Sequence, residues 1–146
     1  MTGISLTCKH QVLNFLNQTP RNKLVILKKE SSSSEFLSID LELAKALRNE
    51  SFNSHFSMIA KGILMDLMNE NLKSNEDFQN YFAICDIGFL LEKELKFDFT
   101  SFLSNQSQNH TLFLKWDGEI INNKLYFLTK QNGLEIDISS LSYIVI

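Results

Sequence analysis

Two short apolar runs in the second half of the chain, Tyr81–Ile87 and Thr111–Trp116, are the strongest constraint on its fold. Each has the length of a strand, and neither alternates apolar with polar residues, which is typical of strands buried on both faces of a parallel sheet. The segment between them is long enough for a right-handed crossover and includes a predicted helix, Phe99–Asn105, with Asp98 as its N-cap. The sequence therefore predicts a βαβ unit at the centre of an α/β domain.

Length and composition predict one globular domain over residues 1–146, to which the central βαβ unit assigns the α/β class. The hydrophobic fraction of 44% is that of a folded chain, and the formal net charge of −3 argues against binding nucleic acid through its phosphates. The two cysteines, Cys8 and Cys85, match no metal or disulfide framework. The N-terminus lacks a signal pattern and no apolar run reaches the ~18 residues of a membrane span, so we expect a cytoplasmic protein without membrane contact.

The first part of the chain has a predicted helix at residues 7–17, which must end before Pro20, and two strand candidates, Lys23–Leu27 and Phe36–Asp40. The serine-rich connection between them, Lys28–Glu35, is shorter than the dozen or so residues of a parallel crossover. We therefore favour an antiparallel hairpin. The alternative is a parallel arrangement in which the connection crosses without a helix.

Two further helices are predicted before the central strands. Asp40 can cap a helix over Leu41–Asn49. His55–Asn71 is the clearest helix in the chain, because its apolar residues recur at i, i+3, i+4 and i+7. Ser74 and Asp77 resemble a capping box that would start a brief turn.

The C-terminal part is predicted to contain an antiparallel hairpin and a last strand. The turn signals are Asn122-Asn123 and Asn132-Gly133, and the second is typical of two-residue hairpin loops. The predicted strands are Glu119–Ile121, Lys124–Thr129, Leu134–Ile138 and Tyr143–Ile146.

The segment after Lys23–Leu27 is where a phosphate-binding loop would stand in a nucleotide-binding α/β protein. A Walker A loop needs glycines, which let the backbone amides close round the phosphates, and none follows this strand. Lys28, Lys29 and the serines up to Ser34 could contact a phosphate, but the glycines and a following helix N-terminus are missing. We interpret the segment as a solvated loop.

Asp86, at the end of the first central strand, could hold Mg²⁺ as a Walker B acid does. The position two residues later, where a catalytic acid might be expected, is Gly88. We interpret Asp86 as a cap or solvated edge residue. Together with Lys28, Lys29 and Ser34 it forms at most a vestigial nucleotide site.

No other motif predicts chemistry. The three histidines are far apart and lack metal-ligand spacing, and the serine run lacks the context of a nucleophile elbow. We therefore predict no catalytic residue, no metal ligand and no cofactor. Glu92, Glu94 and Asp98 are interpreted as a solvated acidic face. Trp116, Gly118 and Glu119 mark either an interaction surface or a packing corner, and packing is favoured because tryptophan is highly buried on average.

These segments resemble a known family, the small P-loop protein of BREX phage-defence islands (the BrxF family), over residues 36–129. The matching positions, in chain order, are Leu41-Glu42-Leu43, Leu90, Glu94-Leu95-Lys96, Asp98, Ser107, Asn109, Thr111, Trp116, Gly118 and Glu119. The resemblance implies a P-loop-NTPase-like α/β fold, a sheet with a parallel centre between helical layers, and a role in bacterial antiviral defence.

The departures from the family pattern are all at positions that carry the family's catalytic and nucleotide-binding groups. Lys28–Glu35 stands in place of the Walker A loop and its helix. The family's Walker B aspartate aligns with Cys85, its downstream acid with Gly88, and the arginines of its turn with Gln108 and His110. The resemblance therefore implies a nucleotide-free relative that has kept the fold.

The leading hypothesis is a non-catalytic pseudo-NTPase that binds other proteins, either as a component of a BREX-type defence system or as a mimic that blocks one. One alternative is a nucleotide-binding ATPase with an irregular phosphate loop formed by Lys28 or Lys29, Ser34 and Asp86. Another is an unrelated small regulatory or immunity-type binding protein, which a sheet with non-parallel central strands would support.

Overall fold

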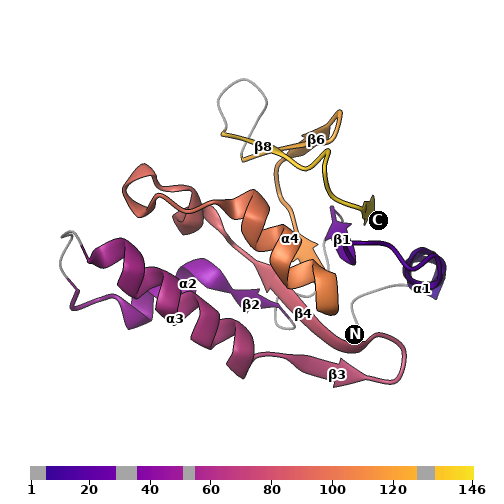
Figure 1. Cartoon of the computed structure of the whole chain (residues 1–146), viewed down its shortest axis with the longest axis horizontal. Helices are drawn as coiled ribbons and strands as arrows, with labels where there is room; N and C mark the ends of the chain where they lie inside the picture. The colour runs from indigo at the N-terminus through magenta and orange to yellow at the C-terminus, as the bar shows by residue number, and fades with distance from the viewer. Residues whose placement is uncertain (1–5, 29–35, 51–54, 128–133) are drawn as a thin grey trace.

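A computed structural model describes residues 6–28, 36–50, 55–127 and 134–146 of the chain (Figure 1). The helical elements are α1 (Leu6–Asn17), α2 (Ile39–Ala46), α3 (Phe56–Glu70) and α4 (Phe99–Asn109), with short 3₁₀ turns η2 (Gly88–Leu91) and η3 (Lys93–Leu95). The strands are β1 (Leu24–Leu27), β2 (Leu37–Ser38), β3 (Lys73–Asn75), β4 (Gln79–Cys85), β5 (Thr111–Lys115), β6 (Glu119–Ile121), β7 (Lys124–Tyr126), β8 (Glu135–Asp137) and β9 (Tyr143–Val145).

The central sheet is mostly parallel, in the order β2-β4-β5-β1-β9, and β3 pairs antiparallel with β4. Strand β5 lies between its two neighbours, so Phe113 is the register partner of Val25 on one side and of Ala83 on the other. Strands β4 and β5 are adjacent and parallel, and α4 connects them. The predicted βαβ unit is therefore confirmed.

The side chains of the central strands alternate between two hydrophobic cores. One core lies against α2, α3 and α4 and includes Leu24, Ile26, Phe82, Ile84, Leu112 and Leu114. The other includes Val12 and Phe15 of α1 together with Val25, Leu27, Tyr81, Ala83, Cys85 and Phe113. Figure 1 shows α2, α3 and α4 grouped together and α1 apart from them. Both faces of the strands are buried, which explains why these segments lack polar alternation.

The helices follow from local signals that the sequence contains. Helix α3 buries Phe56, Ala60, Leu64 and Met68, which recur every fourth residue on one face. Helix α4 begins after Asp98, whose carboxylate accepts hydrogen bonds from the Ser101 backbone N–H at 3.0 Å and from its hydroxyl at 2.8 Å. Both predicted helices are confirmed, and α4 continues to Asn109, beyond its predicted end.

The predicted hairpin between the first two strands is wrong. Strands β1 and β2 lie in one sheet with β5 and β4 between them, and each pairs in parallel with its neighbour. The rule that led to the hairpin treats sequential strands as neighbours. Three interstrand spacings of about 4.8 Å can be spanned by an extended chain as short as Lys28–Glu35, which reaches about 3.3 Å per residue. Most of that connection lies outside the described residues.

Two predicted caps are also wrong. The N-cap of α2 is Ser38, whose hydroxyl accepts a hydrogen bond from the Leu41 N–H, and Asp40 lies inside the first turn. Ser74 does not cap a turn, because it lies in β3 and pairs with Asn80 of β4. The turn after β3 is held instead by the Asn75 side-chain oxygen, which accepts from the Phe78 N–H at 2.7 Å.

The C-terminal segments form a small antiparallel sheet in the order β6-β7-β8. Asn122 and Asn123 both have positive φ, 51° and 63°, as a primed hairpin turn requires, and they join β6 to β7. The Asn132-Gly133 signal and the end of the predicted strand Lys124–Thr129 lie outside the described residues. The final strand, β9, pairs in parallel with β1 at the edge of the central sheet.

None of the helices in the described part of the chain combines the length and the apolar character that crossing a lipid bilayer requires.

The Asp98 cap gives a test of the α4 assignment. We expect Asp98→Ala to lower the free energy of unfolding by about 1 kcal/mol at pH 7, whereas Asp98→Asn, which keeps a side-chain acceptor, costs only a few tenths. The Ser101 N–H lowers the pKa of Asp98 in the folded state, so its contribution is present above the usual pKa and is lost as pH falls. Urea unfolding at pH 7 and pH 3 measures both effects. Equal losses for the two variants, or an Asp98→Ala loss independent of pH, would contradict the assignment.

Candidate functional site

The carboxyl edge of the parallel sheet is the natural place for a site in this fold. Strands β1, β4 and β5 end there, and they are followed by Lys28, Asp86 and Trp116. Helix α2 also begins at this edge, because β2 runs parallel to β4 and ends at Ser38. Segments that are distant in the sequence therefore meet here.

A cleft of ≈ 460 Å³ lies at this edge. Its charged lining residues are Asp40, Asp86, Lys115 and Asp117. Its other lining residues are Ile87, Gly88, Trp116, Gly118 and Phe127. The volume is within the range of small-ligand sites, and the combination of carboxylates with aromatic rings defines what it can bind.

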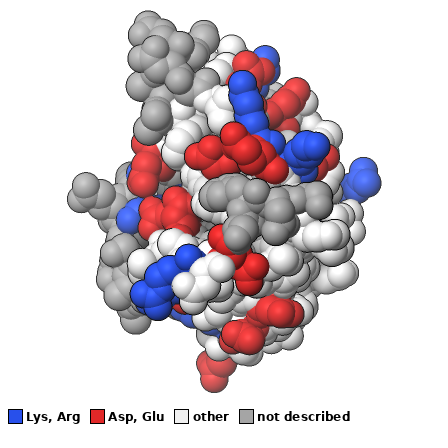
Figure 2. Space-filling model, turned by 90° about the vertical axis from the view of Figure 1, so that its left-hand side faces the viewer, with Lys and Arg blue, Asp and Glu red and all other residues white. Residues whose placement is uncertain are grey.

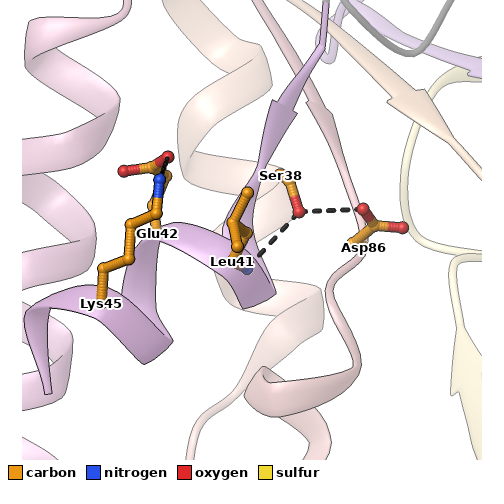
Figure 3. A network of polar contacts seen from close by, with 5 residues as sticks. All are labelled: Ser38, Leu41, Glu42, Lys45 and Asp86. Carbon is orange, nitrogen blue, oxygen red and sulfur yellow. Dashed lines mark hydrogen bonds and ion pairs between the residues drawn. The ribbon is translucent and has the colours of Figure 1, made fainter. Parts of the chain in front are cut away.

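Asp86 is fixed against the start of α2. Its backbone is left-handed, with φ of 52°, and its Oδ2 accepts a hydrogen bond from the Ser38 hydroxyl at 2.8 Å (Figure 3). Its carbonyl oxygen accepts from the Asp40 N–H, also at 2.8 Å. The same Ser38 oxygen caps α2 by accepting from the Leu41 N–H at 3.4 Å. The capping serine thus couples the helix to the acid that follows β4.

Asp40 is a second carboxylate in the cleft. Its Oδ1 accepts a hydrogen bond from the Phe89 N–H at 2.7 Å, which ties α2 to η2. Burial raises the pKa of Asp40, and the nearby negative charge of Asp86 raises it further, against the opposing effect of the backbone hydrogen bonds. The ionised form of Asp40 is therefore disfavoured, and a positive charge in the cleft would stabilise it.

Cys85 occupies the position that the family resemblance assigns to a Walker B aspartate. It is buried at the end of β4, and burial together with the charge of Asp86 raises the pKa of its thiol to about 12. Its Sγ donates to Asp86 Oδ2 at 3.6 Å. A thiol that remains protonated has no charge to attract a metal ion and is a poor nucleophile.

Trp116 lies in the cleft wall and is only 3% exposed. Its ring packs edge-on against Phe127, with 6.5 Å between the ring centroids. Its indole Nε1 is buried and has no hydrogen-bond partner among the described residues. Most buried polar groups are paired, so this donor needs an explanation.

Gly118 is needed beside Trp116 for steric reasons. A Cβ on Gly118 would lie 1.9 Å from the Tyr126 carbonyl oxygen and 3.1 Å from Trp116 Nε1. Glu119, the third residue of the predicted corner, is exposed at the start of β6. Trp116 and Gly118 thus pack tightly where β5 leads into the small sheet, and they line the cleft as well.

The structure brings only part of the predicted nucleotide site together. Asp86 lines the cleft, whereas Lys28 is exposed and its backbone N–H donates to the Ile146 carbonyl at 3.1 Å. Lys29 and Ser34 lie outside the described residues. Among residues 6–28, 36–50, 55–127 and 134–146, no group of three His, Cys, Asp or Glu side chains is close enough to hold a metal ion.

The sequence interpretation missed Asp40 and Asp117 as cleft residues. A usable signal existed, because Asp40 ends one strand candidate and Asp117 follows another, and parallel strands place their carboxyl ends at one edge. The hairpin predicted for the first two strands removed Asp40 from that edge and so hid it.

A pair of glycine substitutions tests the packing of this wall. We expect Gly118→Ala to lower the free energy of unfolding by about 1–3 kcal/mol, because the added methyl group overlaps the Tyr126 carbonyl. Gly62→Ala is the matched control. Gly62 is exposed inside α3 with nothing within 4 Å of an added Cβ, so alanine should stabilise the protein by about 0.5–1 kcal/mol. Urea denaturation measures both, and a Gly118→Ala protein as stable as the parent would refute the close approach.

Comparisons of the chain with protein-family models, with curated proteins and with solved structures found no match. The resemblance to the BREX small P-loop protein therefore remains a prediction from the sequence. The functional argument depends on the geometry and charge of the cleft.

Proposed function

We propose that this chain is a non-catalytic protein-binding component built on a degenerate P-loop-like α/β domain. Its role resembles that of a component of bacterial BREX-type phage defence that no longer binds a nucleotide. The partners are other proteins, and no cofactor takes part.

The charge of the cleft is the observation that supports this proposal most. Asp40, Asp86 and Asp117 line it with three carboxylates, against the single ammonium group of Lys115. The phosphates of a nucleotide would meet repulsion at the edge where α/β proteins usually bind them. If the chain aligns with the family as the resemblance implies, Lys28–Glu35 replaces the phosphate loop and the neutral thiol of Cys85 replaces the magnesium-binding aspartate.

The arrangement of strands supports the relationship over the unrelated alternative. Non-parallel central strands would have supported the unrelated alternative, and β4 and β5 are parallel neighbours. Strand β1, from which a phosphate loop would emerge, lies inside the sheet between β5 and β9.

One observation favours a nucleotide-binding ATPase as the second candidate. Lys28 and Asp86 follow parallel strands of one sheet and so stand at the same edge, as a phosphate-binding lysine and a magnesium-binding acid would. Two features oppose this candidate. Strands β5 and β4 lie between β1 and the edge strand β2, and Asp86 Oδ2 already accepts a hydrogen bond from the Ser38 hydroxyl.

Titration with nucleotide distinguishes the two candidates. We expect no binding heat and no rise in melting temperature with 1 mM ATP or ADP and excess Mg²⁺, because the cleft repels the phosphates. Isothermal titration calorimetry and thermal unfolding are the measurements, with an authentic P-loop ATPase in the same buffer as the positive control.

Saturable, Mg²⁺-dependent binding of ATP would overturn the proposal. In that event Lys28→Ala, Lys29→Ala and Asp86→Asn should each weaken the binding. The exposed Lys45, paired with Glu42 on α2 at 3.6 Å, supplies a control substitution, Lys45→Ala, outside the cleft.

A further inference from the structure

Two further hollows neighbour the cleft. Gly88 and Phe127 line both the cleft and a hollow of ≈ 240 Å³ beside η2 and η3. Glu92 and Glu94 line both that hollow and a third, of ≈ 500 Å³, against Phe56 and Phe89. The three hollows share lining residues and are therefore neighbours in a row, which we call the acidic groove. A row of this kind suits an extended occupant better than a compact one.

The acidic groove has an excess of negative charge along its whole length. Its carboxylates are Asp40, Asp86, Glu92, Glu94 and Asp117, and its only basic residues in the described part of the chain are Lys93 and Lys115. Figure 2 shows the side of the molecule toward which η2 and η3 lie in Figure 1, and acidic side chains cover more of it than basic ones do. The complementary occupant is positively charged.

Aromatic rings accompany the carboxylates along the groove. Trp116 and Phe127 line the cleft, and Phe56 and Phe89 line the third hollow with 6.3 Å between their ring centroids. Phe127 and Phe89 are the partly exposed rings of the four. A guanidinium group stacks on aromatic faces while it donates to carboxylates, and its aliphatic stem packs on apolar surface. The lining therefore fits arginine better than a small inorganic cation.

The carboxylates of the groove require a positively charged donor, whereas Trp116 requires an acceptor. Its buried indole N–H, unpaired within the described residues, is a donor and needs an acceptor. A cation alone supplies none, whereas a peptide supplies a backbone carbonyl beside each side chain. A polypeptide segment meets the needs of the indole and of the carboxylates together.

We propose that the acidic groove binds an extended, arginine-containing segment of a partner protein. An arginine side chain enters the cleft between Asp40 and Asp86, and a backbone carbonyl of the segment accepts from the Trp116 indole. This inference rests on the proposed protein-binding function and names the class of partner for it.

The single tryptophan of the chain makes the site directly observable. The probe is a peptide with arginines alternating with glycine and alanine, and the control is the same peptide with each arginine replaced by citrulline, which keeps the shape and removes the charge. ¹⁵N-labelled protein gives one indole N–H resonance. We expect the arginine peptide to shift it downfield, as a new hydrogen bond requires, and the citrulline peptide to leave it nearly unchanged.

Substitutions assign the binding to the groove. The double variant Asp40→Asn/Asp86→Asn keeps side-chain acceptors for the Phe89 N–H and the Ser38 hydroxyl. We expect it to lower the affinity for the arginine peptide roughly ten-fold. Glu42→Gln is the matched control, because Glu42 lies on α2 and does not line the groove. It should change the affinity less than two-fold. An unchanged melting temperature shows that each variant is folded.

Three outcomes would overturn the inference. The first is the absence of any shift of the indole resonance at millimolar arginine peptide. The second is equal binding of the arginine and citrulline peptides, and the third is equal weakening of binding by the double variant and by Glu42→Gln. None of them affects the proposed function if ATP also fails to bind. Binding of Mg²⁺–ATP at the indole would instead refute the proposed function itself.

Discussion

The burial of β1, β4 and β5 on both faces is the constraint on which the rest of the structure depends. All four residues of β1 are buried, as are Tyr81–Cys85 of β4 and Thr111–Leu114 of β5. Strands of this kind are stable only when helices cover both sides, which fixes α1 on one face and α2, α3 and α4 on the other. Polar chemistry is thereby confined to the ends of the strands, where the chain turns.

At the carboxyl edge this confinement concentrates unfavourable groups. Asp86 leaves β4 with a left-handed backbone, and Asp40 is partly desolvated beside it. The Trp116 indole has lost its water without gaining a partner in the described residues, at a cost of about 1–3 kcal/mol for a buried polar group. Groups that cost stability and lie in one cleft are typical of binding sites, because natural sequences depart from optimal packing mainly where function requires it.

The sequence predicts the strongly buried and strongly periodic elements well and the spatial neighbours poorly. Apolar continuity identified β4 and β5, and the four-residue spacing from Phe56 to Met68 identified α3, because these signals are local. The order of β1 and β2 could not be read this way, because β4 and β5, which separate them, come much later in the chain. The site was only partly predicted for the same reason. Asp86 was recognisable from its own strand, whereas its pairing with Asp40 depends on the position of β2.

The geometry of the acidic groove also indicates which of its contacts would supply affinity. Asp86 and Asp117 are exposed, and ion pairs of exposed side chains contribute only about 0.2–1 kcal/mol each and weaken with salt. The buried indole and the aromatic walls are desolvated already, so a partner carbonyl and an arginine stem would gain more there. Carboxylates along the groove would then select a basic segment and speed its approach, while the Trp116 corner would hold it. Loss of the corner should therefore lower affinity at every ionic strength, and loss of a carboxylate chiefly at low salt.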